Sequence, residues 1–170
     1  MLSLSITLAA LTALTVPTAS SAAPASTSFR IVGYEYAFTS TVGSFAGRGS
    51  GDAGETAFWN TVVKHDRLGP EPAYVNGGSL ALTTRSAGGR LDAIAGRLTH
   101  HGGTITTLSR GPGCTNQRYR VVAALHDVRT RTTTGGSGEF TVTLTHYRKR
   151  LLGRCVAYKA RVAGTASFTY

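Results

Sequence analysis

The feature of this sequence that most constrains its fold is an alternation of apolar and polar residues with a period of two. Successive side chains on a β-strand point to opposite faces, so this pattern predicts strands with one buried face. In the first such segment the pattern places Glu35 on the opposite, solvent-facing side. The apolar faces of the four clearest segments are Val32, Tyr34, Tyr36 and Phe38; Tyr119, Val121, Ala123 and Leu125; Phe140, Val142 and Leu144; and Val156, Tyr158, Ala160 and Val162.

Less regular alternation predicts four more strands, and glycine-rich breaks separate the segments as turns. These strands span residues 57–65, 79–84, 91–98 and 103–108, and the breaks lie at 47–52, 76–78, 88–89, 101–103, 111–113 and 135–138. The sequence therefore predicts an antiparallel, all-β fold of about eight strands. Closure removes the free edges of a sheet, so we expect a β-barrel. A two-sheet sandwich fits the same pattern and is the alternative.

The N-terminal segment has the pattern of a secretory signal peptide. Residues 2–16 are mostly apolar and carry no charge, and small residues follow up to Ala25. Cleavage after Ala22 or after Ala25 suits a signal peptidase. The apolar stretch is shorter than the roughly 20 residues that a membrane anchor needs. We therefore expect a signal peptide over residues 1–25, a secreted protein, and a single β-barrel domain over residues 26–170.

The two cysteines, Cys114 and Cys155, are predicted to form a disulfide, because a disulfide persists outside the cell membrane. If the last three strands form a meander, both cysteines lie at the same end of the sheet. No histidines lie at ligand spacing from the cysteines, so we expect neither a metal site nor a cofactor.

The chain is strongly basic, with a net charge of +10, and every charged residue lies at or after Arg30. Such a charge attracts polyanions, including nucleic acid, lipid headgroups and acidic envelope polymers. The cations are scattered, apart from the run Arg148–Arg150, so we expect a solvated surface and no specific nucleic acid partner. Outward cations such as Arg118 and Arg161 also argue against strands that span a membrane. We expect a monomer.

The C-terminal half resembles small secreted proteins of high-GC Gram-positive bacteria that have no assigned function. The resemblance covers roughly residues 80–170, and its motifs lie at 114–117, 138–140, 144–148 and 153–158. More distantly, the strand pattern is similar to the allene oxide cyclase and dirigent barrels and to lipocalin-like barrels. The resemblance implies a barrel and brings no activity with it.

Catalytic signatures are missing from the sequence. It contains no nucleophile elbow, zinc-protease helix, phosphate loop or dinucleotide fingerprint in its required context. The candidate ligand-binding residues are His146, Arg148, Tyr36 and Tyr158. His146 and Arg148 continue an apolar strand face with polar side chains, and Tyr36 and Tyr158 lie on predicted inward faces. The alternative is that His146 only caps the core with a hydrogen bond.

We therefore expect a non-catalytic, exported binding module for a small apolar or amphipathic ligand or for a protein partner. One alternative is a cationic protein that binds cell-envelope polymers or other polyanions. A third hypothesis is an isomerase or cyclase that acts in the barrel cavity through His146, Tyr36 or Tyr158, with Arg148 holding an anion.

Overall fold

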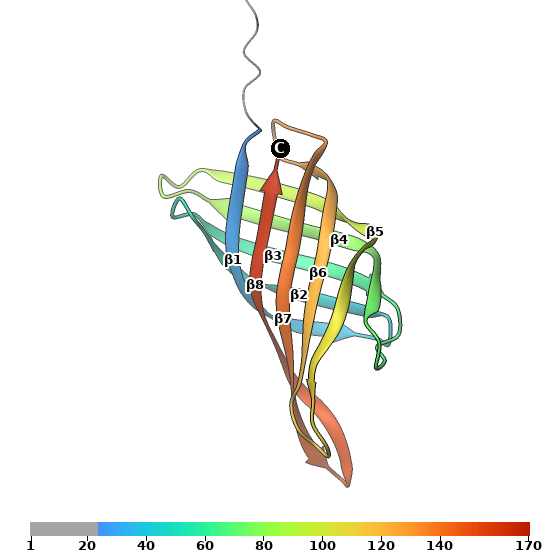
Figure 1. Ribbon diagram of the computed structural model, residues 1–170. Coiled ribbons are helices and arrows are strands. Elements are labelled where there is room, and N and C mark those ends of the chain that lie inside the picture. Colours follow the sequence, from blue (N-terminus) through green and yellow to red (C-terminus); the bar gives the residue numbers. More distant parts are fainter. Residues whose placement is uncertain (1–23) are drawn as a thin grey trace, which may run out of the picture.

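The structure is a computed structural model that describes residues 24–170, so the predicted signal peptide lies almost wholly outside the described residues. Eight antiparallel strands form a closed barrel in which each strand pairs with the next and β8 pairs with β1 (Figure 1). This confirms the predicted all-β barrel, and the sandwich alternative is not formed. The strands are β1 (Ser26–Phe38), β2 (Val42–Gly51), β3 (Thr56–His65), β4 (Ala73–Arg85), β5 (Leu91–Arg110), β6 (Gln117–Arg129), β7 (Gly136–Leu151) and β8 (Arg154–Thr169).

The up-and-down order of the strands gives the barrel two distinct ends. The loops 39–41, 66–72, 111–116 and 152–153 lie at one end, which we call the disulfide end. The other end, which we call the terminal end, carries the start of β1, the end of β8 and the remaining loops. In Figure 1, β6 to β8 run steeply down the view whereas β2 to β4 run across it, so opposite walls of the barrel cross.

A single apolar core fills most of the barrel. On β6 and β7 the predicted inward faces are confirmed, because Tyr119, Val121, Ala123 and Leu125, and Phe140, Val142 and Leu144, are all buried. On β8 the prediction holds for Ala160 and Val162 but is wrong for Tyr158, whose side chain is exposed. The core therefore follows the period-two pattern along strands that stay inside the barrel wall.

The predicted inward face of β1 is wrong. Phe29 and Ile31 are 2% and 1% exposed, whereas Val32, Tyr34 and Tyr36 are more than half exposed and lie outside the barrel. Phe29 and Ile31 share the parity of Glu35, so that carboxylate points inward rather than to solvent. Both faces of β1 carry large apolar residues, and periodicity within one strand cannot choose between them. A contact with β3 decides which face of β1 points into the barrel.

That contact is the packing of Trp59, on β3, against two glycines. Gly33 and Gly47 are paired across β1 and β2, and a Cβ atom at Gly33 would lie 2.8 Å from Cζ2 of Trp59. The indole Nε1–H donates to the backbone oxygens of Val32 and Arg48, both at 3.1 Å. Trp59 is 2% exposed and lies in the core. A side chain at Gly33 would collide with the indole, and one at Gly47, which is paired with Trp59 on β3, would collide with the backbone of Val32.

Three elements differ most from the expected strand boundaries. The turn predicted at 76–78 lies inside β4, where the pairing with β5 is irregular between Tyr74 and Ser79. β2 was not predicted, because its glycines were interpreted as a turn, whereas they line the barrel interior. The predicted strands 91–98 and 103–108 form one long strand, β5, and the predicted turn between them is an irregularity in its pairing with β6 between Leu98 and Gly103. His101 there has a φ of 55°, a left-handed conformation that lets the backbone bend without ending the strand.

The predicted disulfide is confirmed. Cys114, in the loop 111–116, is bonded to Cys155 at the start of β8, and their Cα atoms are 5.4 Å apart. Both cysteines lie at the disulfide end, as the meander predicts. A disulfide is compatible with an extracellular location, where thiols stay oxidised.

Candidate functional site

A cavity of about 250 Å³ opens at the disulfide end of the barrel. Its rim is formed by the loops 39–41 and 66–72, and its floor is the apolar core. The apolar lining consists of Phe38, Phe45, Val63, Leu68, Ile105, Val121 and Leu144. The polar lining consists of Glu35, Thr39, Ser40, His65, Arg67 and His146. The cavity is slightly smaller than the range of roughly 300–1,000 Å³ that is common for ligand pockets.

The wall of the cavity contains a buried acid–base pair. Oε2 of Glu35 lies 2.7 Å from Nε2 of His146, although the two residues are 111 positions apart in the chain. Their side chains are 4% and 15% exposed. In the part of the chain that the structure describes, no second hydrogen-bond partner is found for the Glu35 carboxylate, so it retains capacity to accept another hydrogen bond.

Local structure explains how these two side chains meet. His146 follows Leu144 on the inward face of β7, and the ring of Tyr119 packs edge-on against it at 5.5 Å. On β1 a bulge between Glu35 and Ala37 brings Phe38, which is 63% exposed, to the rim of the cavity, where its ring lies 6.1 Å from that of His146. The bulge therefore lets Glu35 and Phe38 both line the cavity, although they are three positions apart and would otherwise point to opposite faces.

The loop between β3 and β4 is held in place beside the cavity mouth. The carboxylate of Asp66 accepts hydrogen bonds from Nδ2 of Asn76 at 2.7 Å and from the backbone N–H of Tyr74 at 3.3 Å. The hydrogen bond from Asn76 is the main cause that lowers the pKa of Asp66 below its ordinary value. This bonding fixes the start of the loop that carries Arg67 and Leu68 to the rim.

Of the four residues predicted to bind a ligand, the structure places only His146 in the cavity. Tyr36 is 57% exposed on the outer face of β1, and Tyr158 is 56% exposed on β8 beyond the barrel wall, so their predicted inward positions are wrong. Arg148 lies past a bulge at Tyr147 and Arg148, where its backbone N–H donates to Oδ1 of Asn116. These three residues do not line the cavity.

Sequence reasoning missed Glu35, which is the only carboxylate of the cavity lining and is almost fully buried. A signal was present, since Phe29 and Ile31 precede Glu35 at the same parity while Arg30 lies on the other. A face that buries two large apolar residues is expected to continue inward. The stronger run of Val32, Tyr34 and Tyr36 on the other face concealed this signal.

The cavity has the chemistry of a binding site for a mainly apolar molecule. The apolar lining offers contact area, the Glu35 carboxylate can accept a hydrogen bond, and Arg67 at the rim carries a positive charge. Within residues 24–170 no group of three histidine, cysteine or acidic side chains is arranged to hold a metal ion. No helix in the same range is long and apolar enough to cross a membrane.

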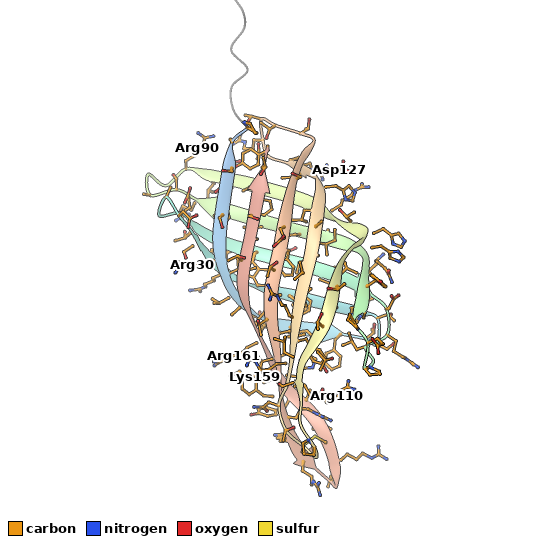
Figure 2. All side chains as sticks on the ribbon, in the orientation of Figure 1. Arg30, Arg90, Arg110, Asp127, Lys159 and Arg161 are labelled. Carbon is orange, nitrogen blue, oxygen red and sulfur yellow. A yellow bond between two sulfur atoms is a disulfide. The ribbon has the colours of Figure 1, made fainter. Side chains whose placement is uncertain are left out.

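A second concave region lies on the outside of the barrel, across β2, β1 and β8. This outer groove is wide and shallow, with a volume of about 800 Å³, and its lining includes Tyr34, Arg48, Tyr158, Lys159 and Arg161. Figure 2 shows Lys159 and Arg161 near one another beside β8. The only acidic residue of the lining is Glu35, whose carboxylate is turned to the interior. The groove therefore combines exposed aromatic rings with positive charge.

These features define a closed, eight-stranded antiparallel barrel with a small, largely apolar cavity at one end. Comparison with protein-family models, with curated proteins and with solved structures finds no match to this chain. The resemblance to secreted bacterial barrels thus stays a prediction.

Proposed function

We propose that this protein is a secreted, non-catalytic binding module that holds a small, mainly apolar ligand in the cavity at the disulfide end. The observation that carries the proposal is the Glu35–His146 pair in the wall of an otherwise apolar cavity. A barrel that needed only a core would fill this space with apolar side chains, because burying a carboxylate has a desolvation cost.

The lining indicates what kind of ligand fits. An apolar body would replace water against Phe45, Val121 and Leu144, and one polar group would donate a hydrogen bond to the free oxygen of Glu35. An alcohol, an amine or an amide meets this requirement, and the small volume favours a compact molecule over a long acyl chain. The positive side chain of Arg67 lies at the rim, where a second polar group of the ligand would remain hydrated.

The first test is native mass spectrometry of the secreted protein, which detects a small molecule released only on unfolding. The second is a fluorescence titration with the neutral apolar dye N-phenyl-1-naphthylamine. A Val63→Phe substitution places a ring in the cavity and should weaken dye binding at least about tenfold. Val62→Phe is the matched control. Val62 directly precedes Val63 on β3 and points outward, so dye binding should not change.

A Ser40→Trp substitution repeats the test at the exposed rim, where it does not disturb the core. Circular dichroism and thermal melting establish that each variant is folded. Equal dye affinity in wild type and in both cavity variants would show that the cavity is not the site, and the proposal would fail.

The outer groove favours a second candidate function, the binding of an acidic envelope polymer. The guanidinium of Arg48 lies 5.6 Å from the ring centre of Phe58, and Nζ of Lys149 lies 5.0 Å from that of Tyr158, so cations and exposed rings are interleaved on this face. Such a surface can pair with acidic groups and stack on flat or sugar rings.

Retention on a heparin column at physiological salt tests this second candidate. The double substitution Lys159→Ala/Arg161→Ala should elute at lower salt than Arg85→Ala/Arg129→Ala, which removes the same charge from the terminal end. Equal elution of the two variants would mean that net charge alone causes retention, and the groove would not be a site.

A further inference from the structure

The last residues of β7 and the first residues of β8 extend beyond the barrel wall. β6 pairs with β7 only as far as His146, and β1 pairs with β8 only as far as Arg161, so the chain between them continues as a two-stranded hairpin. The disulfide from Cys114 ties the loop 111–116 to this hairpin. Figure 1 shows the resulting protrusion at the lower end of the view, and Figure 2 places Arg110 beside it. We call residues 110–116 and 148–155 the tip.

The tip carries positive charge and no negative charge. It holds five cations and no Asp or Glu. Four of the five are exposed and the fifth is half-buried. The cations are Arg110, Arg148, Lys149, Arg150 and Arg154.

Two leucines form the end of the tip. Leu151 is 53% exposed and Leu152, in the two-residue turn, is 96% exposed. A scattered surface leucine needs no explanation. These two, however, lie at the end of the protrusion, between Arg150 and Arg154 in the chain, and neither packs against the core.

The backbone at Leu152 is also unfavourable for leucine. Its φ is 48°, and Gly153 follows at 75°. A two-residue hairpin loop with both residues left-handed is the type that Asn-Gly or Asp-Gly prefers, because Asn and Asp adopt this conformation more readily than leucine. Leu152 therefore adopts a conformation that is unfavourable for leucine, and its exposed side chain makes no contact with the core in compensation.

From the apolar end, the cationic collar and the disfavoured turn, we propose that the tip docks on an anionic lipid bilayer, with Leu151 and Leu152 entering the interfacial region. The five cations meet the anionic headgroups while the two leucines leave water. A hydrated polyanion would use the cations equally well but would gain nothing from the leucines, so the geometry favours a lipid surface. The cavity mouth lies at the same end of the barrel and would face the bilayer.

Vesicle sedimentation tests the proposal with phosphatidylcholine vesicles that do or do not contain phosphatidylglycerol. Wild type should bind only the anionic vesicles at physiological salt. Leu152→Asn keeps every charge and suits the turn, and it should weaken binding about tenfold through the lost apolar contact. Leu91→Asn, which changes an exposed leucine at the terminal end, should bind like wild type.

The charge is tested by a matched pair of double variants with the same net charge. Lys149→Glu/Arg150→Glu should weaken binding at least about 30-fold, since each cation near the surface contributes about fivefold. Arg85→Glu/Arg129→Glu should retain most of the binding. Val63→Phe should bind vesicles like wild type, which separates this proposal from the cavity.

Three results would each overturn the proposal. The first is equal binding to vesicles with and without phosphatidylglycerol. The second is undiminished binding by Leu152→Asn, which would make the tip a general polyanion site. The third is an equal loss in the two double charge variants, which would trace the effect to net charge.

Discussion

At the scale of single residues, the Glu35–His146 pair is where the barrel departs from an apolar interior. A carboxylate and an imidazole 2.7 Å apart, with side chains 4% and 15% exposed, interact in a medium less polar than water. Each partner offsets the desolvation cost of the other. If one partner is removed, the other is left buried with an unmet hydrogen-bonding group.

A double-mutant cycle is expected to reveal this coupling. Glu35→Leu and His146→Phe should each lower the free energy of unfolding by about 3 kcal/mol, because each leaves the partner buried and unpaired. The double variant should lose clearly less than the sum of the two, since it leaves no unpaired group. Urea denaturation of the four proteins measures the coupling.

Glu139→Leu is the control for this cycle, because Glu139 is an exposed carboxylate on β7 and its loss should change stability by less than about 0.5 kcal/mol. Strict additivity of the Glu35 and His146 substitutions would show that the two side chains do not support one another.

The same pair shows how far the sequence can lead at this scale. His146 could be predicted, because it continues the face of Phe140, Val142 and Leu144 with a polar group. Glu35 could not be chosen from its strand alone: Phe29 and Ile31 indicate its face, but the opposite face carries more apolar residues, and the choice depends on Trp59, which is 24 positions further on. A contact between distant residues settles the direction of the strand, and no local pattern contains it.

At the scale of elements, alternation identifies strands whose inward residues are large and misses those whose inward residues are small. β6 and β7 were predicted because their inward side chains are bulky. β2 was missed because its inward positions include Gly47 and Gly49, which signal a turn in most sequences but here make room for side chains on neighbouring strands. The bent β5 was divided for the same reason, since glycine marked a bulge and not an end.

The β7–β8 hairpin depends on the disulfide more than any other element does. Beyond the barrel wall its two strands form ladder hydrogen bonds only with each other, and a two-stranded hairpin alone is marginally stable. Replacing Cys114 and Cys155 with Ala should lower the free energy of unfolding by about 3–4 kcal/mol, the cost expected for opening a loop of this length. Thermal melting checks this loss.

Hydrogen exchange should locate part of that effect in the tip. In the variant with both cysteines replaced by Ala, the amides of residues 148–157 should exchange faster than in wild type. Exchange rates in the middle of β6 should change only as much as the loss of global stability requires. Uniform acceleration over the whole barrel would contradict the view that the disulfide braces the hairpin locally.

At the scale of the whole molecule, the barrel is closed by pairing its first strand with its last. The seam continues past the strand ends, where Ala25 and Tyr170 exchange two backbone hydrogen bonds of 2.9 Å each. The side chain of Tyr170 packs against the core at the terminal end. Burial is the main cause that raises the pKa of Tyr170 above its ordinary value, and the carboxylates of Asp92 and Glu55 raise it further.

This raised pKa predicts how closure responds to alkali. The folded barrel keeps the phenol of Tyr170 protonated at pH values where the unfolded chain has begun to lose that proton. The stabilising contribution is therefore complete below about pH 10, and it is lost as the pH rises through the higher folded pKa.

Wild type should lose more stability than Tyr170→Phe between about pH 9 and about pH 11, as measured by the midpoint of urea denaturation. Tyr34→Phe, which removes an exposed phenol from β1, should follow wild type. If Tyr170→Phe lost stability as steeply as wild type, the phenol would be equally solvated in both states, and closure of the barrel would rest on the backbone seam and the core without it.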